Sequence, residues 1–224
     1  MDATASRHSW LRKLAGTFLV FEGPDGSGKT TQMRRFKQML DDAGLSTVEV
    51  REPGGTAIGE QIREVLLHTK AEMTLRCEML LYMASRAQLM EERIEPAIAS
   101  RACVLSDRFV GSTLAYQGAA GGIPERDIRA VAQVAIGGRW PDLNVLFDVD
   151  TETAMKRLNP LLDRMEGKGM DFHRRVRDGY LAEAHRDPKR HLVIDASRSP
   201  DEVFEQLING LRRWSESFSP AVAG

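Results

Sequence analysis

The sequence predicts an α/β fold: a five-stranded parallel sheet flanked by helices on both faces. Short apolar segments alternate along the chain with longer amphipathic segments, which is typical of parallel strands joined by crossover helices. The first apolar segment, TFLVFE at residues 17–22, is followed by a glycine. Its nearly continuous apolar character is typical of a strand buried on both faces. Ligands of such sheets bind beyond the carboxyl ends of the strands.

The remaining elements follow from the same two patterns. Short runs of apolar and β-branched residues predict strands at residues 17–22, 45–51, 102–106, 144–149 and 192–195. Apolar residues spaced three and four apart, with glycine near helix ends and proline near helix starts, predict the helices. These lie at residues 29–43, 57–68, 73–100, 108–122, 124–137, 151–158, 170–185 and 200–214.

Composition and charge exclude several classes of protein. The 224 residues include 31 Lys and Arg and 32 Asp and Glu, and 42% are hydrophobic. This composition excludes a disordered or collagen-like chain, and the balanced charge gives no overall attraction to nucleic acid. No apolar run approaches the roughly 20 residues that cross a bilayer. The two cysteines, Cys77 and Cys103, form no disulfide framework and are expected to be reduced and buried.

We expect one domain over residues 17–214, between an N-terminal extension, residues 1–16, and a C-terminal tail, residues 215–224. The extension has no apolar run long enough for a secretory signal, which favours the cytoplasm. We expect it to be flexible and partly docked on the domain. Three of its residues would share one face of a short helix: Trp10, Leu11 and Leu14. The charged segment 158–169 interrupts two helices and is the candidate lid.

The strongest motif is GPDGSGKT at residues 23–30, between a predicted strand and a predicted helix. It matches the G-x-x-x-x-G-K-[ST] pattern, in which backbone N–H groups surround phosphate oxygens. Lys29 would reach the β- and γ-phosphates of a nucleotide, and the Thr30 hydroxyl would bind Mg²⁺. The residues expected to contact the nucleotide are Gly23, Pro24, Asp25, Gly26, Ser27, Gly28, Lys29, Thr30 and Thr31.

Further candidates follow the second and third strands. Asp107 lies just after the third strand and would hold Mg²⁺ or its water, and Arg108 would bind an anionic phosphate. An ion pair between these two residues is the alternative. The REPGGT turn places Arg51 and Glu52 at the rim of the site, although such a turn also occurs without function.

Two groups of helical residues are candidates for binding a flat base. Tyr82 and Arg86 are four residues apart and share a helix face, so one would stack on a base and the other would bond a base carbonyl. An ordinary surface pair is the alternative. Gln117 is a candidate reader of base edges, with Thr113 and Tyr116 nearby in sequence, although such residues also cap helices or meet solvent.

The combination of FEGPDGSGKTT, REPGGT, ASRAQL, SDRF, STLAYQG, LDR and DFHRRVRDGYL resembles the thymidylate kinase family, from about residue 17 to residue 214. The resemblance implies a P-loop kinase fold, and transfer of the γ-phosphoryl group of ATP to dTMP with Mg²⁺. It implies small-molecule partners and a homodimer, with no nucleic acid or membrane.

The resemblance also implies a role for each matching residue. Residues 23–31 would hold ATP. Asp25 would face the sugar 3′-hydroxyl and the metal region, with Thr30 and Asp107 as further metal candidates. Arg108 and Arg63 would bind the dTMP phosphate.

On the base side, the resemblance implies that Tyr82 stacks on thymine and that Arg86 bonds its O4 edge. Thr113 and Gln117 would read N3 and the nearby polar edges. Tyr116 would crowd C2′ and reject a ribose hydroxyl. Glu52 belongs to the same expected substrate-binding set.

The phosphate loop and the lid both depart from the patterns of the family. Some members carry an arginine within the phosphate loop, whereas positions 24–27 here are Pro, Asp, Gly and Ser. Members without that arginine usually have an arginine-rich lid, and here the candidates are Arg157, Arg164 and Lys168. We expect Arg164 to supply the transition-state charge and Arg157 to lie near the adenine. A lid ion pair between Asp163 and Arg164 is the alternative.

Two other functions remain open from the sequence. One is a kinase for another nucleoside monophosphate. The other is a non-catalytic nucleotide-binding P-loop protein. The chain has no N-K-x-D base reader and no L-S-G-G-Q-like signature, so guanine-specific switches and ABC-type motors are disfavoured.

Overall fold

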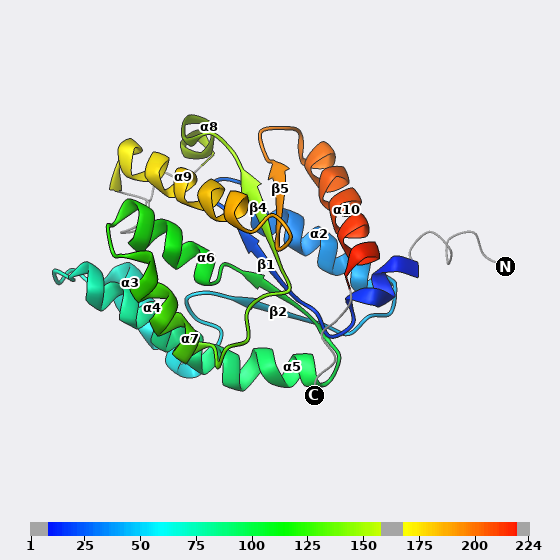
Figure 1. The fold of residues 1–224 in the computed structure, drawn as a ribbon, viewed down its shortest axis with the longest axis horizontal. Coiled ribbons are helices and arrows are strands. Elements are labelled where there is room, and N and C mark those ends of the chain that lie inside the picture. Colours follow the sequence, from blue (N-terminus) through cyan, green and yellow to red (C-terminus); the bar gives the residue numbers. More distant parts are fainter. Residues whose placement is uncertain (1–8, 158–167, 219–224) are drawn as a thin grey trace.

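The computed structural model describes residues 9–157 and 168–218. Five parallel strands form one sheet in the order β2-β3-β1-β4-β5, with β1 at its centre (Figure 1). The strands are β1 (Phe18–Glu22), β2 (Thr47–Arg51), β3 (Cys103–Asp107), β4 (Leu143–Asp148) and β5 (His191–Asp195). The parallel five-stranded sheet predicted from the sequence is confirmed.

Helices surround this sheet, and each predicted helix has a counterpart. They are η1 (Ser9–Leu14), α2 (Lys29–Asp42), α3 (Ala57–His68), α4 (Leu75–Leu89), η2 (Met90–Ile94), α5 (Glu95–Ala99), α6 (Val110–Thr113), η3 (Leu114–Ala120), α7 (Glu125–Ala135), α8 (Thr151–Lys156), α9 (Met170–Arg186) and α10 (Pro200–Ser217). No helix of the described residues is long and apolar enough to cross a membrane.

Two of the predicted helices differ in detail. The helix expected at residues 73–100 is continuous from α4 to α5, with the π-helical segment η2 within it. The helix expected to begin at residue 108 begins at Val110, because Arg108 has a φ of 73°. That left-handed conformation is incompatible with a helical turn. Within the predicted helix, residues 114–120 are π-helical.

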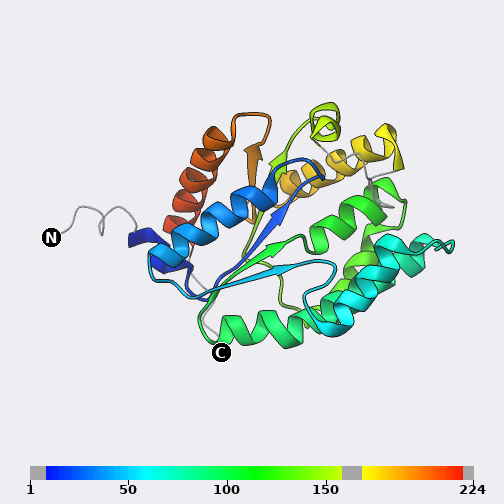
Figure 2. The ribbon, with the colours of Figure 1, turned by 180° about the vertical axis from the view of Figure 1, so that it is seen from behind.

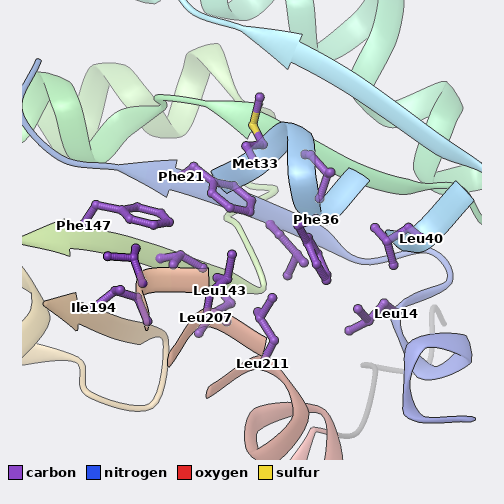
Figure 3. Packing of buried hydrophobic residues seen from close by; sticks show 14 of the residues in the cluster. Leu14, Phe21, Met33, Phe36, Leu40, Leu143, Phe147, Ile194, Leu207 and Leu211 are labelled. Carbon is purple, nitrogen blue, oxygen red and sulfur yellow. The ribbon is translucent and has the colours of Figure 1, made fainter. Parts of the chain in front are cut away.

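The two sides of β1 face two different cores. Leu19 and Phe21 pack with residues of α2 and α10, as Figure 3 shows for Phe21, Phe36 and Leu211. Phe18 and Val20 pack with residues from α4 to α7 on the opposite face. Figure 2 shows these two helical layers from behind. Side chains alternate across a strand, so a wholly buried strand needs apolar residues at nearly every position, as β1 has.

Residues 9–14 of the N-terminal extension, which we expected to be flexible, form η1, a 3₁₀-helix. Trp10, Leu11 and Leu14 are buried and join the core between α2 and α10. Figure 3 shows Leu14 at the end of this core. The predicted shared face of these three residues is therefore confirmed, and their burial is what fixes the helix.

Leu14→Ala should lower the free energy of unfolding by about 2–5 kcal/mol, because a fully buried leucine leaves a cavity when truncated. Chemical denaturation measures this difference. Arg12→Ala is the matched control, since Arg12 is exposed on the same helix. Equal stabilities of the Leu14 and Arg12 variants would contradict the packing of η1.

The cysteine prediction is half wrong. Cys103 is buried in β3, but Cys77 is exposed on α4. The helical spacing of apolar residues in a sequence does not determine which face of α4 is covered.

Candidate active site

The glycine-rich loop at residues 23–28 joins β1 to α2. Gly26 has a φ of 81°, and a Cβ there would overlap the backbone of Ala154 in α8. A side chain at Gly26 is thus excluded both by conformation and by space. The loop leads directly into the N-terminus of α2, where backbone N–H groups favour bound anions.

Lys29 and Thr30 lie beside the end of β3. The buried Lys29 Nζ is 3.5 Å from Asp25 Oδ1 and 3.9 Å from Asp107 Oδ1. The Thr30 hydroxyl donates a hydrogen bond to Asp107 Oδ2 at 2.6 Å. The phosphate loop therefore lies beside the end of the third strand. This arrangement brings the Lys29 ammonium group close to several oxygen atoms that could bind a metal ion.

These oxygen atoms are suitable ligands for a magnesium ion that also binds the phosphates of a nucleotide. Mg²⁺ is commonly held by one or two carboxylates together with substrate phosphates and water. The Thr30 hydroxyl and the Asp107 carboxylate offer such a partial set. Across residues 9–157 and 168–218, no group of three or more His, Cys, Asp or Glu side chains could hold a metal alone. Substrate phosphate oxygens and water would complete the ligands of such an ion.

Arg108 forms an ion pair with Asp25, at 2.6 Å between Nη2 and Oδ1. In the described part of the chain no ion pair joins it to Asp107, so the alternative considered from the sequence is wrong. Its Nη1 donates to Gly23 O, Ser112 Oγ and Tyr180 OH, each at 3.1 Å. Burial raises the pKa of Asp25, but Arg108 and Lys29 outweigh that effect and hold the pKa well below its usual range. Asp25 is consequently ionised at neutral pH.

Glu22 holds the backbone around Arg108, a role that the sequence analysis missed. Its Oε1 accepts hydrogen bonds from the backbone N–H groups of Phe109 at 2.9 Å and Ser112 at 3.1 Å. Its Oε2 accepts from Ser112 Oγ at 2.6 Å. The sequence does contain one indication of this role, because Glu22 is the acidic last residue of an otherwise apolar strand. A buried acid of this kind requires hydrogen-bond partners. These bonds fix the backbone that directly follows Arg108.

Arg86 is buried beneath the cavity, so the alternative of an ordinary surface pair is wrong. Its Nε donates to Glu52 Oε2 at 2.7 Å, and its Nη2 donates to Phe109 O at 3.0 Å and Thr113 Oγ1 at 3.2 Å. Its Nη1 contacts Met83 Sδ at 3.0 Å, and a thioether sulfur is only a weak acceptor. Arg86 Nη1 therefore remains available to a stronger acceptor in the cavity.

Glu52 is buried rather than exposed at the rim, in contrast to Arg51, which is exposed and pairs with Glu60. The reason is its ion pair with Arg86, at 2.6 Å. Burial raises the pKa of Glu52 to about 7, with the nearby Arg86 opposing that rise and Glu22 adding to it. Glu52 Oε1 has no hydrogen-bond partner, so it is the oxygen free to take a proton.

The raised pKa of Glu52 predicts a pH dependence of stability. Between its usual pKa near 4.5 and its folded value of about 7, the folded chain binds more protons at Glu52 than the unfolded chain. Its contribution to stability therefore falls as the pH rises through that window. The free energy of unfolding of the parent relative to Glu52→Gln should decline from pH 5 to pH 8. The control is Glu64→Gln, a change at an exposed residue. If the difference in free energy of unfolding between the parent and Glu52→Gln stayed constant from pH 5 to pH 8, as it should for the control, the prediction would be contradicted.

Tyr116 and Gln117 lie on η3 at the other side of the cavity. The Tyr116 hydroxyl is 3.4 Å from Asp25 Oδ2, and the Arg108 guanidinium lies 5.3 Å from the centre of the Tyr116 ring. Gln117 Nε2 donates to the buried Glu78 Oε1 at 2.8 Å. Glu78 and Tyr180 were also missed, because they lie far from Gln117 and Arg108 in the sequence.

A single cavity of about 300 Å³ collects most of the predicted site. Its lining includes Asp25, Lys29, Thr30, Glu52, Arg63, Tyr82, Arg86, Asp107, Arg108, Thr113, Tyr116 and Gln117. Arg157 does not line this cavity, and its Nη1 donates to Ala196 O at 2.9 Å instead. Arg164 lies outside the described residues. Phosphate-binding and base-binding candidates thus share one space, at the carboxyl ends of β1, β2 and β3.

Comparison with known proteins decides the family. The family model described as thymidylate kinase matches residues 21–207. The chain belongs to the thymidylate kinase family. It is 44% identical over 193 residues to a thymidylate kinase of Kosmotoga olearia, covering 85% of this chain and 93% of that one. It is 45% identical over 196 residues to a thymidylate kinase of Deinococcus radiodurans, covering 86% and 94%.

A solved structure agrees with this assignment. The crystal structure of thymidylate kinase from Ehrlichia chaffeensis superposes with a TM-score of 0.74 at 32% identity, covering 88% of this chain and 99% of the other. The P-loop kinase fold of the thymidylate kinase family, which the resemblance implied, is confirmed.

Proposed function

We propose that this chain transfers the γ-phosphoryl group of ATP to dTMP, giving dTDP and ADP. The observation that carries the proposal is the shared cavity, in which Lys29 of the phosphate loop lies with Arg108 and with the base-slot residues Tyr82 and Arg86. A site for the ATP phosphates and a site for a nucleoside monophosphate thereby face each other. We propose that the enzyme uses ATP and dTMP in the cytoplasm.

Charge neutralisation and placement are the main requirements of this reaction. Phosphoryl transfer needs an in-line arrangement and stabilisation of charge on the phosphoryl oxygens. Lys29 would bind the ATP phosphates, while Arg108 and Arg63 would bind the dTMP phosphate. When bound, Mg²⁺ would neutralise phosphate charge, held by Thr30 and Asp107 together with ATP oxygens. The dTMP phosphate is itself an anionic nucleophile, so no strong general base is required.

The sugar and base ends of dTMP meet different groups. Asp25 would accept the 3′-hydroxyl, and the Tyr116 ring would exclude a ribose 2′-hydroxyl. Tyr82 would stack on the thymine ring. Arg86 would donate to O4 through Nη1, which now meets only a sulfur in the described part of the chain.

The lid is proposed to complete the site. We place Arg164 at the transferring phosphoryl group and Arg157 near the adenine, with residues 158–169 covering ATP. Closure of such a segment excludes the water that would otherwise accept the phosphoryl group.

A homodimer is proposed from the apolar surface of three adjacent helices. The large exposed apolar residues include Ile58 and Val65 on α3, Leu80 on α4 and Val134 on α7. Contacts join α3 to α4 and α4 to α7, so these residues belong to one layer (Figure 1). Burial of such a surface against a second copy is favourable.

Sedimentation velocity tests the dimer. We expect about twice the mass of one chain for the parent protein, and a monomer for Leu80→Glu combined with Val134→Glu, because pairing would bury four carboxylates per dimer. A monomeric parent, or an unchanged mass of the variant, would contradict the proposed pairing.

The substrate assignment is tested by offering dTMP, dUMP, dCMP, dGMP and dAMP in parallel with ATP and Mg²⁺, and by following ADP formation. We expect the largest kcat/KM for dTMP, with weaker use of dUMP. A preference for another monophosphate would replace the thymine assignment by the alternative kinase. Binding of ATP with no turnover of any monophosphate would support the non-catalytic alternative.

A further inference from the structure

The side-chain amide of Gln117 is held in one orientation. Gln117 is 2% exposed and lines the cavity, whereas its partner Glu78 is 1% exposed and lies behind it. The 2.8 Å bond runs from Gln117 Nε2 to Glu78 Oε1. A carboxylate offers only acceptors, so the amide must turn its nitrogen toward Glu78. In the described part of the chain, no hydrogen bond reaches Gln117 Oε1, which is left for a ligand.

We propose that Glu78 is a specificity-determining positioning residue, which makes Gln117 an acceptor for a base that carries a hydrogen at N3. The inference rests on the proposed function, in which a pyrimidine monophosphate occupies this cavity. Glu78 acts through Gln117 and does not itself touch the base.

Arg86 supplies the opposite polarity in the same cavity. Glu52, Phe109 O and Thr113 fix its guanidinium, and a guanidinium has only donors. The cavity therefore presents one acceptor, from Gln117, and one donor, from Arg86. Thymine and uracil present the complementary pair, with a donor at N3 and an acceptor at O4. Cytosine presents an acceptor at N3 and a donor at its 4-amino group, so both contacts would be mismatched.

A carboxylate is better suited than an amide to this role. If residue 78 were glutamine, its amide would offer both a donor and acceptors, and Gln117 would be able to turn over and present its nitrogen to the cavity. Lys168 Nζ lies 3.7 Å from Glu78 Oε1, so a cation also faces this carboxylate. Lys168 also lies 4.8 Å from the centre of the Phe172 ring in α9.

Glu78→Gln tests the proposal with a side chain of nearly the same shape. The readout is the ratio of kcat/KM for dTMP to that for dCMP. We expect this ratio to fall about tenfold or more, because buried polar groups that lose their partners discriminate by about that factor. The fall should come from KM, with kcat for dTMP changed only a few-fold. Glu91→Gln, an exposed change further along the same long helix, should leave the ratio unchanged.

The exchange variant Glu78→Gln combined with Gln117→Glu separates orientation from general damage. In it, Gln at position 78 donates to Glu at position 117, whose second oxygen again presents an acceptor to the cavity. We expect the preference for dTMP over dCMP to recover at least partly. Melting temperatures will show that each variant is folded.

Calorimetry measures the dissociation constants of dTMP and dCMP without any need for turnover. We expect the preference for dTMP in binding to fall in Glu78→Gln and to recover at least partly in the exchange variant. A parent that binds dTMP but has no kinase activity would contradict the proposed function alone. An unchanged ratio in a folded Glu78→Gln variant, or an exchange variant no better than Glu78→Gln alone, would overturn the role of Glu78.

Discussion

Lys29→Met is expected to lower kcat for dTMP phosphorylation by about 10²–10³-fold. Lys29 Nζ lies 3.5 Å from Asp25 Oδ1 and 3.9 Å from Asp107 Oδ1, and it would stabilise charge on the phosphates as the transferring group moves. Loss of one such preorganised group typically has an effect of that size. The effect should fall mainly on kcat, because the interaction strengthens as negative charge redistributes in the transition state.

Steady-state kinetics at saturating ATP and dTMP measures this effect. Lys37→Met is the matched control, because Lys37 lies on the same helix and pairs with Asp41 rather than with the site. It should keep near-parental turnover. A Lys29→Met variant with kcat within about threefold of the parent would contradict the assignment of Lys29 to the transferring phosphoryl group.

Arg164→Ala is expected to lower kcat by about 10³-fold or more, the range in which transition-state arginines act. Positions 24–27 of the phosphate loop contain no basic residue, and we propose that Arg164 supplies the positive charge at the transferring phosphoryl group. Arg157→Ala provides the comparison. The Arg157 guanidinium donates to Ala196 O and Ser197 O, and we expect its loss to raise KM for ATP with a smaller change in kcat. Near-normal turnover of Arg164→Ala would contradict the proposed role.

The sequence predicts the sheet and the phosphate loop well because both depend on local patterns. The apolar run of β1 and the glycines before Lys29 each lie in one short segment, so both patterns can be recognised without knowledge of distant contacts. Asp107 was predictable for a related reason, since a residue at the end of a neighbouring parallel strand must lie close to the loop.

Residues that act through another residue were not predictable in this way. Glu22 supports the backbone at Arg108, and Glu78 orients Gln117, but each pair is separated by a long stretch of sequence and by no fixed spacing. The burial of Glu52 was missed for the same reason. Its sequence neighbours form a polar turn, and only the ion pair with Arg86, on a different helix, accounts for an acid in that position.

Transfer of a phosphoryl group between two nucleotides is the reaction proposed for this cavity. Its most direct test is a reaction of ATP labelled at the γ-phosphoryl group with dTMP and Mg²⁺, in which labelled dTDP and labelled free phosphate are both quantified. We expect nearly all transferred label to appear in dTDP, and Lys29→Met to lose this product. Label released mainly as free phosphate, or no labelled dTDP at all, would contradict it.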